Sequence, residues 1–291
     1  MAKYADLIYD VGLHRGEDTD FYLRKGFRVV AFEANPENAE FCRARFADAL
    51  QSRQLTLISG AIVDRPAGGF PQRVAFYRNL MCSTWGTVHR DWAEGKARRG
   101  APSTTIEVDA VDFAAVLECH GVPHYLKLDV EGCEETCLSA LRRFQERPDY
   151  ISLESEHSSF THIRREIDLL KELGYDGFQI VDQLELAERQ APPFPPREGE
   201  FVPQRFERGS TGLFGAELPG SWRTGRHSLR RYRTLRAGWV LAGDGGVIRR
   251  STMRGIWRLE SLVRRAIRWL AGMALSGWYD THARHGSVVR E

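Results

Sequence analysis

Two carboxylates and two glycines lie close together near the start of the chain. An apolar run at 7–11 carries Asp10 and is followed by Gly12 and Gly16. Glu33 comes 21 residues after Gly12, in the segment VVAFEANP. In α/β sheets, a strand that turns sharply on glycine lets the backbone pass close to a nucleoside, and a carboxylate ending the next strand holds the ribose diol. The same residues could instead form a purely structural corner between a strand and a helix.

A dinucleotide-binding fingerprint, G-x-G-x-x-G, is an alternative interpretation of this segment. If Gly12 opens that fingerprint, His14 stands where its second glycine should be. The backbone there could not approach a pyrophosphate as closely. An acid just before the first glycine also suits a positively charged ligand better than a phosphate. A nicotinamide cofactor is therefore the less favoured alternative.

A second group of charges lies in YLKLDVEGCEE (125–135). Alternation along a strand puts Lys127, Asp129 and Glu131 on one side if the extended geometry persists. They follow a predicted core strand, at the sheet edge where α/β proteins bind ligands. Three charges in an apolar strand are hard to explain by packing, so they indicate either a functional site or a buried ion-pair network.

The elements that must position these residues alternate between strand and helix, which predicts a doubly wound, mostly parallel α/β sheet. We expect strands at 7–11, 28–34, 55–63, 124–130, 149–155 and 176–182, and 210–218 as a seventh, antiparallel edge strand. Helices are expected at 17–25, after Pro36, at 112–121 with Asp112 as N-cap, at 135–144 and at 162–175. Residues 73–79 have hairpin character, an irregular stretch follows to about 103, and 190–204 is expected to be a loop.

Three motifs, DVGLHRG, FEANP and LKLDVEGCEE, resemble those of the FkbM family of S-adenosylmethionine-dependent methyltransferases. That family usually shows D-V-G-A-x-x-G, then E-x-N-P, then K-I-D-V-E-G-x-E. The resemblance covers about residues 5–218 and departs from the family at Leu13-His14-Arg15. It implies a class I methyltransferase (Rossmann-like) fold and O-methylation, often of sugar or polyketide hydroxyls.

The resemblance also implies which residues form the site. The predicted contacts to S-adenosylmethionine are Asp10, Gly12, Gly16, Glu33, Ala34, Asn35, Gly60 and Ala61. The catalytic candidates are Lys127, Asp129, Glu131 and His157, with Asp129 and Glu131 beside the transferable methyl group. A hydroxyl acceptor needs a base, for which Asp129, Glu131 or His157 could serve. The two acids could instead hold a divalent metal, which we do not favour because no His/carboxylate spacing demands it.

The acceptor is expected to be a small molecule with a hydroxyl group. A glycan or a lipid-linked molecule is an open alternative. The loop from Asn79 to Trp85 could line its site, although it could equally be a packed loop. Cys133 and Cys137, four apart, are expected to be buried helix positions rather than metal ligands. A different class of function remains open, in which the domain binds a ligand without catalysis and acts through its basic tail.

Charge divides the chain into a predicted methyltransferase domain at 1–219 and a basic, partly helical extension at 220–291. The extension holds 15 arginines, no lysine and four acids, out of 41 basic and 39 acidic residues in the whole chain. Residues 253–274 form an amphipathic pattern, expected to pack on the body, to self-associate or to lie on an anionic membrane. Six arginines at 223–236 would also suit nucleic acid, but no RNA-binding motif accompanies them.

Composition is that of a soluble globular protein, with 42% hydrophobic and 27% charged residues in 291. No apolar run approaches the roughly 20 residues that span a bilayer, and we expect no signal peptide. The five cysteines form no C-x-x-C pair, which favours a reducing compartment. A cytoplasmic location follows as an expectation, with peripheral contact to the inner face of the membrane through 253–274.

Overall fold

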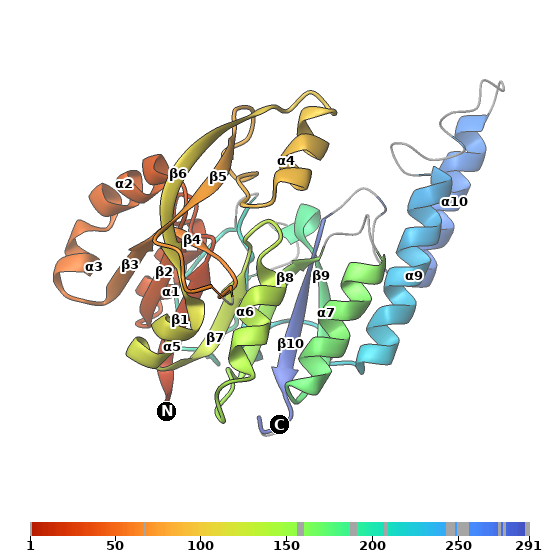
Figure 1. The fold of residues 1–291 in the computed structure, drawn as a ribbon. Helices are drawn as coiled ribbons and strands as arrows, with labels where there is room; N and C mark the ends of the chain where they lie inside the picture. The colour runs from red at the N-terminus through yellow and green to blue at the C-terminus, as the bar shows by residue number, and fades with distance from the viewer. Residues whose placement is uncertain are drawn as a thin grey trace. The chain divides into compact units, whose positions relative to one another are not determined.

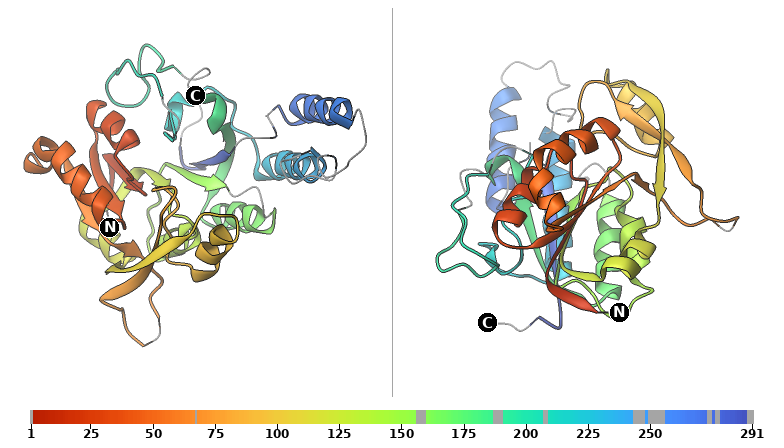
Figure 2. Two further views of the ribbon diagram at one scale, coloured as in Figure 1. Left: turned by 90° about the horizontal axis from the view of Figure 1, so that it is seen from above. Right: turned by 90° about the vertical axis from the view of Figure 1, so that its left-hand side faces the viewer.

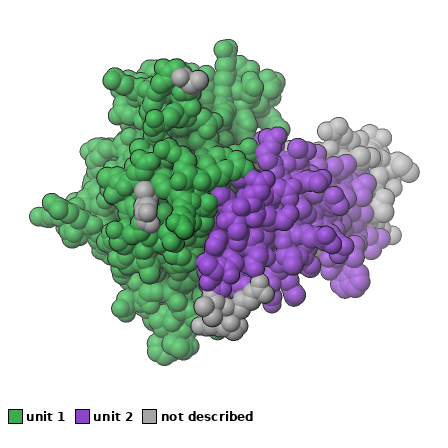
Figure 3. All heavy atoms as spheres, turned by 60° about the horizontal axis from the view of Figure 1, so that its bottom comes forward, with its two compact units in different colours: residues 1–153, 191–204, 212–218 green, residues 154–190, 205–211, 219–291 purple. Residues whose placement is uncertain are grey.

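The chain forms two compact units, coloured separately in Figure 3. A computed structural model describes residues 2–66, 68–155, 160–186, 191–206, 209–242, 248, 256–272, 275 and 278–288. The first unit comprises residues 1–153, 191–204 and 212–218. The second unit comprises residues 154–190, 205–211 and 219–291.

The first unit is built on five parallel strands in the order β3-β2-β1-β7-β8. Their bounds are Lys3–Val11 (β1), Arg28–Glu33 (β2), Leu55–Ser59 (β3), Val122–Leu128 (β7) and Tyr150–Ser155 (β8), of which β8 ends in the second unit. Strands buried on both faces read as near-continuous apolar runs, and residues 7–11 of β1 are all buried. These runs are why the sequence predicted the strands close to their observed positions.

The helices of the first unit lie on both faces of this sheet (Figures 1 and 2). The chain runs outward from β1 to β3 in one direction and from β7 to β8 in the other, and right-handed crossovers then place the two sets of helices on opposite faces. The helices are Glu17–Arg24 (α1), Pro36–Arg45 (α2), Ala47–Gln51 (α3), Phe113–His120 (α5) and Glu134–Leu141 (α6). Asp112 caps α5 as predicted, accepting from the backbone N–H groups of Ala114 and Ala115.

A three-stranded sheet in the order β4-β6-β5 completes the first unit, from Ala61–Ile62 (β4), Arg73–Asn79 (β5) and Ser103–Val111 (β6). The strand expected at 55–63 is broken at Gly60, whose φ is 144° and where a Cβ would lie 2.6 Å from the carbonyl oxygen of Asp109. The stretch expected to be irregular contains a helix, Arg90–Ala97 (α4). No regular element lies within 191–204, in agreement with the loop expected there.

The second unit contains Phe160–Glu172 (α7), Tyr175–Asp182 (β9), Gly225–Ala242 (α9), Ile256–Ala271 (α10) and Tyr279–His285 (β10). Strands β9 and β10 pair antiparallel. Within this unit, Ser155 at the end of β8 and Thr281 of β10 share a hydrogen bond of 2.5 Å. Helices α9 and α10 pack closely, since a Cβ on Gly238 would lie 2.6 Å from Cγ1 of Ile267.

The seventh strand was predicted in the wrong place. Residues 215–217 form a 3-10 turn, and the antiparallel partner of β9 is β10 instead. Gly212 and Gly215 have φ of 89° and 60°, which an extended strand excludes. The doubly wound, mostly parallel α/β fold is confirmed. The segment 220–291 is not only a helical extension, because β10 pairs with β9; the boundary at 219 stays a prediction.

Candidate active site

The turn after β1 is shaped by the neighbouring strand ends of the first unit. Gly12 has a φ of 96°, and a Cβ there would lie 1.9 Å from the carbonyl oxygen of Asp129. The N–H groups of Gly12 and Leu13 both donate to the carbonyl of Phe32, at 3.2 and 2.9 Å. Gly16 begins α1 in a left-handed conformation against the ring of Phe46. The glycines therefore let β1, β2 and β7 end close together.

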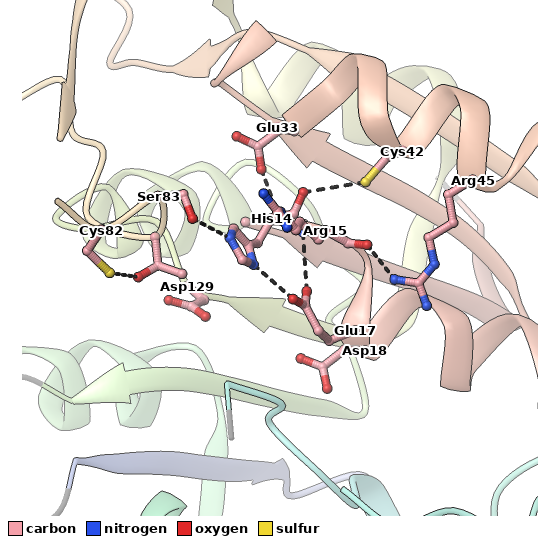
Figure 4. Close-up of polar contacts among 12 residues, drawn as sticks. His14, Arg15, Glu17, Asp18, Glu33, Cys42, Arg45, Cys82, Ser83 and Asp129 are labelled. Carbon is pink, nitrogen blue, oxygen red and sulfur yellow. Dashed lines mark hydrogen bonds and ion pairs between the residues drawn. The ribbon is translucent and has the colours of Figure 1, made fainter. Parts of the chain in front are cut away.

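Glu33 lies at the end of β2, where its carboxylate is 8% exposed. One oxygen accepts from the backbone N–H of His14 (Figure 4) and the other from that of Asn35, each at 2.7 Å. Burial raises the pKa of Glu33 to about 7, against the effect of these two donors. The side chain of Asn38 is a third hydrogen-bond partner of this carboxylate. Because a carboxylate offers about four acceptor positions, Glu33 can still accept a ribose hydroxyl.

The other predicted cofactor contacts surround Glu33. Asn35 caps α2 by accepting from the N–H of Glu37 at 3.1 Å, and Ala34 links it to Glu33. Gly60 donates its N–H to the carbonyl of Glu33 at 2.9 Å, and Ala61 is buried next to it. These residues shape the backbone at the ends of β2 and β3.

Asp10 and Lys127 form the centre of a buried ion-pair network. Nζ of Lys127 lies 3.0 Å from Asp10, 3.3 Å from Asp18 and 3.1 Å from the carbonyl of Gly12. The other oxygen of Asp10 accepts from Thr19 at 2.6 Å. Burial opposes the charge of Lys127, but Asp10, Asp18 and Asp129 together hold its pKa well above its usual range.

This network involves two of the predicted site residues. Asp10 is fully buried, and its two oxygens accept from Thr19 and Lys127. Its contact to the cofactor stays a prediction. Lys127 is 4% exposed and holds its proton among three carboxylates, so we assign it a positioning role instead of a catalytic one. Of the two interpretations left open by the sequence, the ion-pair network is what these two residues form.

Asp129 and Glu131 follow β7 in different conformations. The extended geometry ends at Leu128, and Glu131 has a φ of 42°, so the three charges do not share one side as alternation predicted. The carboxylate of Asp129 is 40% exposed and 3.8 Å from Lys127. Glu131 is 15% exposed and pairs with Lys96 at 2.7 Å. Asp129 is therefore the more accessible of the two acids.

His14 joins two other polar side chains, in an arrangement that the sequence did not predict (Figure 4). Its Nδ1 lies 3.0 Å from Oε1 of Glu17, and its Nε2 lies 2.8 Å from Oγ of Ser83. Glu17 is partly desolvated, yet hydrogen bonds from His14 and the Arg15 backbone keep its pKa below the usual range. An ionised Glu17 orients the imidazole, so Nε2 is available to a hydroxyl group in the position of Ser83.

The chain matches the family model described as the methyltransferase FkbM domain over residues 10–176. The chain belongs to the FkbM methyltransferase family. This match includes both charged strand ends described above. A comparison with curated proteins finds no significant match.

Solved structures similar to this FkbM methyltransferase have low identity to it. A precorrin-6y C5,15-methyltransferase from Geobacter metallireducens is 14% identical, covers 62% of this chain and 69% of its own, and has a TM-score of 0.35. A geranyl diphosphate C-methyltransferase from Streptomyces coelicolor is 11% identical, covers 96% and 73%, and has a TM-score of 0.36. Neither activity nor substrate is inferred from these similarities.

Two further expectations concern residues around this site in the FkbM methyltransferase. His157 lies outside the described residues. The described residues contain no group of three or more His, Cys, Asp or Glu side chains that could hold a metal ion. Cys133 and Cys137 are free and buried; Cys137 lies in α6 as expected, whereas Cys133 is the residue just before that helix. Burial raises the pKa of Cys133 to about 12, which disfavours the thiolate that binds metals.

The sequence pointed to His14 as a departure from the family pattern and to Ser83 as part of a loop that could line the acceptor site, but it gave no signal for Glu17. Glu17 was read as the first residue of a helix. Ser83 belongs to the 79–85 loop that was expected to line the acceptor site or to be packed; Asn79 anchors that loop by accepting from the N–H groups of Met81 and Cys82, both at 3.0 Å. Spacing along the chain could not place residues 14 and 83 together.

Proposed function

We propose that this FkbM methyltransferase uses S-adenosylmethionine to methylate a hydroxyl group of a sugar, glycan or polyketide-like small molecule. The observation that carries the proposal is the pair of acids at the ends of β2 and β7, the two strands that flank β1. Glu33 is buried with acceptor capacity to spare, and Asp129 is partly exposed next to the Gly12 turn. Such an edge binds ligands in open α/β sheets.

The residues present fit the cofactor. Glu33 would hold its ribose hydroxyls, and the turn at Gly12 to His14 would lie along its amino-acid part with Asp10 supporting that turn from below through Lys127. When bound, S-adenosylmethionine supplies a methyl group on a positively charged sulfur atom. The chain must then align the acceptor hydroxyl with this group and take its proton.

Two side chains could take the proton. Asp129 is partly exposed beside the Gly12 turn, and His14 offers Nε2 to a hydroxyl that would replace Ser83. The carboxylate of Asp129 lies 3.8 Å from Nζ of Lys127, whereas Nδ1 of His14 is held by Glu17 and its Nε2 lies 2.8 Å from a hydroxyl oxygen. We therefore assign the proton transfer to His14 and the alignment of the acceptor to Asp129.

The test combines binding with turnover over a panel of hydroxyl acceptors. Titration calorimetry should show binding of S-adenosylmethionine and its demethylated product, and Glu33→Gln should weaken both about tenfold. If the protein bound neither molecule, the enzyme proposal would be wrong. Binding without turnover on any acceptor would favour the non-catalytic module.

The base is tested with two substitutions in the same assay. His14→Gln should lower kcat about 100-fold or more while changing cofactor affinity little, because it removes the proton acceptor but keeps the backbone N–H to Glu33. Asp129→Asn should mainly raise the KM for the acceptor. If Asp129→Asn instead lowered kcat and His14→Gln mainly raised the KM for the acceptor, Asp129 would be the base.

We also propose that α10 contacts an anionic membrane. Leu262, Trp269 and Leu270 are 58%, 83% and 62% exposed and recur at helical spacing, with exposed Arg265 on the same helix. No described helix is long and apolar enough to cross a bilayer. Trp269→Ser should reduce binding to vesicles containing phosphatidylglycerol. If Trp269→Ser left vesicle binding unchanged, or if it reduced self-association of the protein instead, the proposal would be contradicted. A truncation after residue 219 is not a suitable test, because it also removes β10.

A further inference from the structure

A cavity of about 390 Å³ lies in the second unit, between β9 and the first turns of α9. Its walls come from residues 178–182 of β9 and from the segment 219–231. The volume lies within the range of small-molecule sites, and none of the residues assigned to the methyltransferase site lines it.

Positive charge gathers on the α9 side of this cavity. His227 and Arg231 are four residues apart on one side of α9, and Arg223 lies just before the helix, paired with Phe178 of β9. All three residues line the cavity. In the described part of the chain, no acidic side chain forms an ion pair with Arg223. Partial burial lowers the pKa of His227, and the charges of Arg231, Arg223 and Arg230 lower it further.

One acidic residue also lines the cavity, but it is already engaged. Asp182 is 8% exposed, and its Oδ1 accepts from the N–H of Leu184 at 3.1 Å, which caps the short turn after β9. The charge facing the cavity is therefore net positive.

Neutral donors complete the lining on the β9 side. Gln179 is 7% exposed, and its Nε2 is buried without a hydrogen-bond partner. Its carboxamide lies against Gly220, where a Cβ would come within 2.2 Å of Oε1, and both residues line the cavity. A buried amide without a partner is costly, so a ligand that accepts its hydrogen bond would be favoured.

The backbone of β9 adds a further donor. The N–H and carbonyl groups of Phe178 pair with Arg223 at 2.7 and 2.9 Å, on the side of β9 away from β10. Backbone groups alternate between the two sides of a strand, so the N–H of Ile180 points to that same side. Ile180 also lines the cavity.

We propose that this cavity binds a phosphate group through Arg223, Arg231 and the Gln179 amide. A tetrahedral oxyanion accepts several hydrogen bonds at once, and guanidinium groups bind it with two parallel ones. The phosphate could belong to a soluble phosphomonoester or to the headgroup of phosphatidate. The site is independent of the methyl-transfer proposal, because it needs neither the cofactor nor turnover.

The test measures binding to the full-length protein. Titration calorimetry at pH 7.5 with inorganic phosphate and with glycerol 3-phosphate provides the soluble arm, and flotation with vesicles containing phosphatidate provides the lipid arm. Arg223→Gln should weaken binding about tenfold. The matched control is Arg226→Gln, which removes the same charge three residues further along the chain, from a residue that lines a separate cavity between α7 and α9. It should change affinity less than about twofold.

His227 gives a second readout by NMR. Bound phosphate places negative charge near the imidazole, so its pKa should rise in the wild-type protein and not in Arg223→Gln. The neighbouring charges that also act on it are Arg223, Arg230 and Arg231. Gln179→Leu, which keeps every charge, should weaken binding by several-fold and confirm the contribution of the amide.

The outcomes separate cleanly. Binding in the soluble arm, or in the lipid arm alone, supports the site if Arg223→Gln loses it and Arg226→Gln keeps it, and the arm identifies the source of the phosphate. Equal losses in both arginine variants would show only the general attraction of a basic helix and would overturn the proposal. No binding in either arm would overturn it as well.

Discussion

Charged side chains are arranged differently at the strand ends of the first unit and on the α9 surface of the second unit. Around Lys127, the first unit buries a cation together with Asp10 and Asp18, within 3.3 Å of both. At the start of α9, the exposed Arg223, just before the helix, and Arg226, in its first turn, form no ion pair with an acidic side chain among the described residues. Neutralised buried charges hold a fixed geometry, whereas uncompensated charges on a surface favour an anionic ligand.

The strongest test of this contrast removes the buried cation. Lys127→Met leaves Asp10 and Asp18 buried without their counter-charge, which should cost about 3–5 kcal/mol in the free energy of unfolding. Arg223→Gln in the second unit should change that free energy by less than about 0.5 kcal/mol. Urea unfolding followed by circular dichroism measures both. Equal effects of the two substitutions would abolish the distinction between the regions.

A second test asks whether the Gly12 turn is fixed by its neighbours or by its own φ. Gly12→Ala combines a positive φ with a Cβ 1.9 Å from the Asp129 carbonyl and should cost about 2–4 kcal/mol. Gly100→Ala is the matched control, with a φ of 88° and no atom within 4 Å of the added Cβ. It should cost about 1 kcal/mol. Similar costs would mean that close packing of the strand ends contributes nothing.

These two regions also differ in how well sequence predicts them. The strands around the first site are apolar runs ending in charged motifs, so their positions could be predicted. The role of Lys127 could not be predicted. Alternation along a strand predicts which face of the sheet a side chain lies on, but not whether its charge is paired there. Glu131 was misplaced because its left-handed backbone ends the alternation. The pairing of His14 with Ser83 depends on a loop whose path the sequence does not encode locally.

The second unit was harder to predict because its decisive contacts join distant segments. β10 pairs with β9 across about 100 residues, and the 210–218 segment has a similar apolar pattern, so only its glycines distinguish it. The arginines of α9 were visible as a charge run. Their arrangement beside Gln179 was not, because β9 lies more than 40 residues earlier.

A third test uses pH to compare the units. His282 in β10 is buried with an unpartnered Nε2, and burial lowers its pKa to about 3. Because the unfolded state takes up this proton near pH 6.5 and the folded state does not, stability falls as pH falls below 6.5. The loss should be about 1.4 kcal/mol per pH unit, or about 2 kcal/mol between pH 6.5 and 5. His282→Leu should remove this slope, and an unchanged slope would show that other groups cause it.

Glu33 in the first unit should show the opposite dependence on pH. Its folded pKa of about 7 lies above the unfolded value of 4.5, so the folded state binds the extra proton between those values. Its contribution to stability is therefore fully present below pH 4.5 and is lost as pH rises to 7. Ribose hydroxyls prefer the ionised carboxylate, so affinity for S-adenosylmethionine should fall about tenfold between pH 8 and pH 6.

The matched variant separates Glu33 from the titration of the ligand itself. Glu33→Gln keeps the shape of the side chain but cannot ionise, so any pH dependence that remains in its affinity belongs to the ligand or to other groups. The same variant keeps only one acceptor oxygen, so the backbone N–H of His14 or of Asn35 loses its partner. It should therefore be less stable than the wild type at pH 8 without ligand, by about 1 kcal/mol. A variant that was as stable as the wild type and bound S-adenosylmethionine equally well would show that neither the turn nor the ribose depends on this carboxylate.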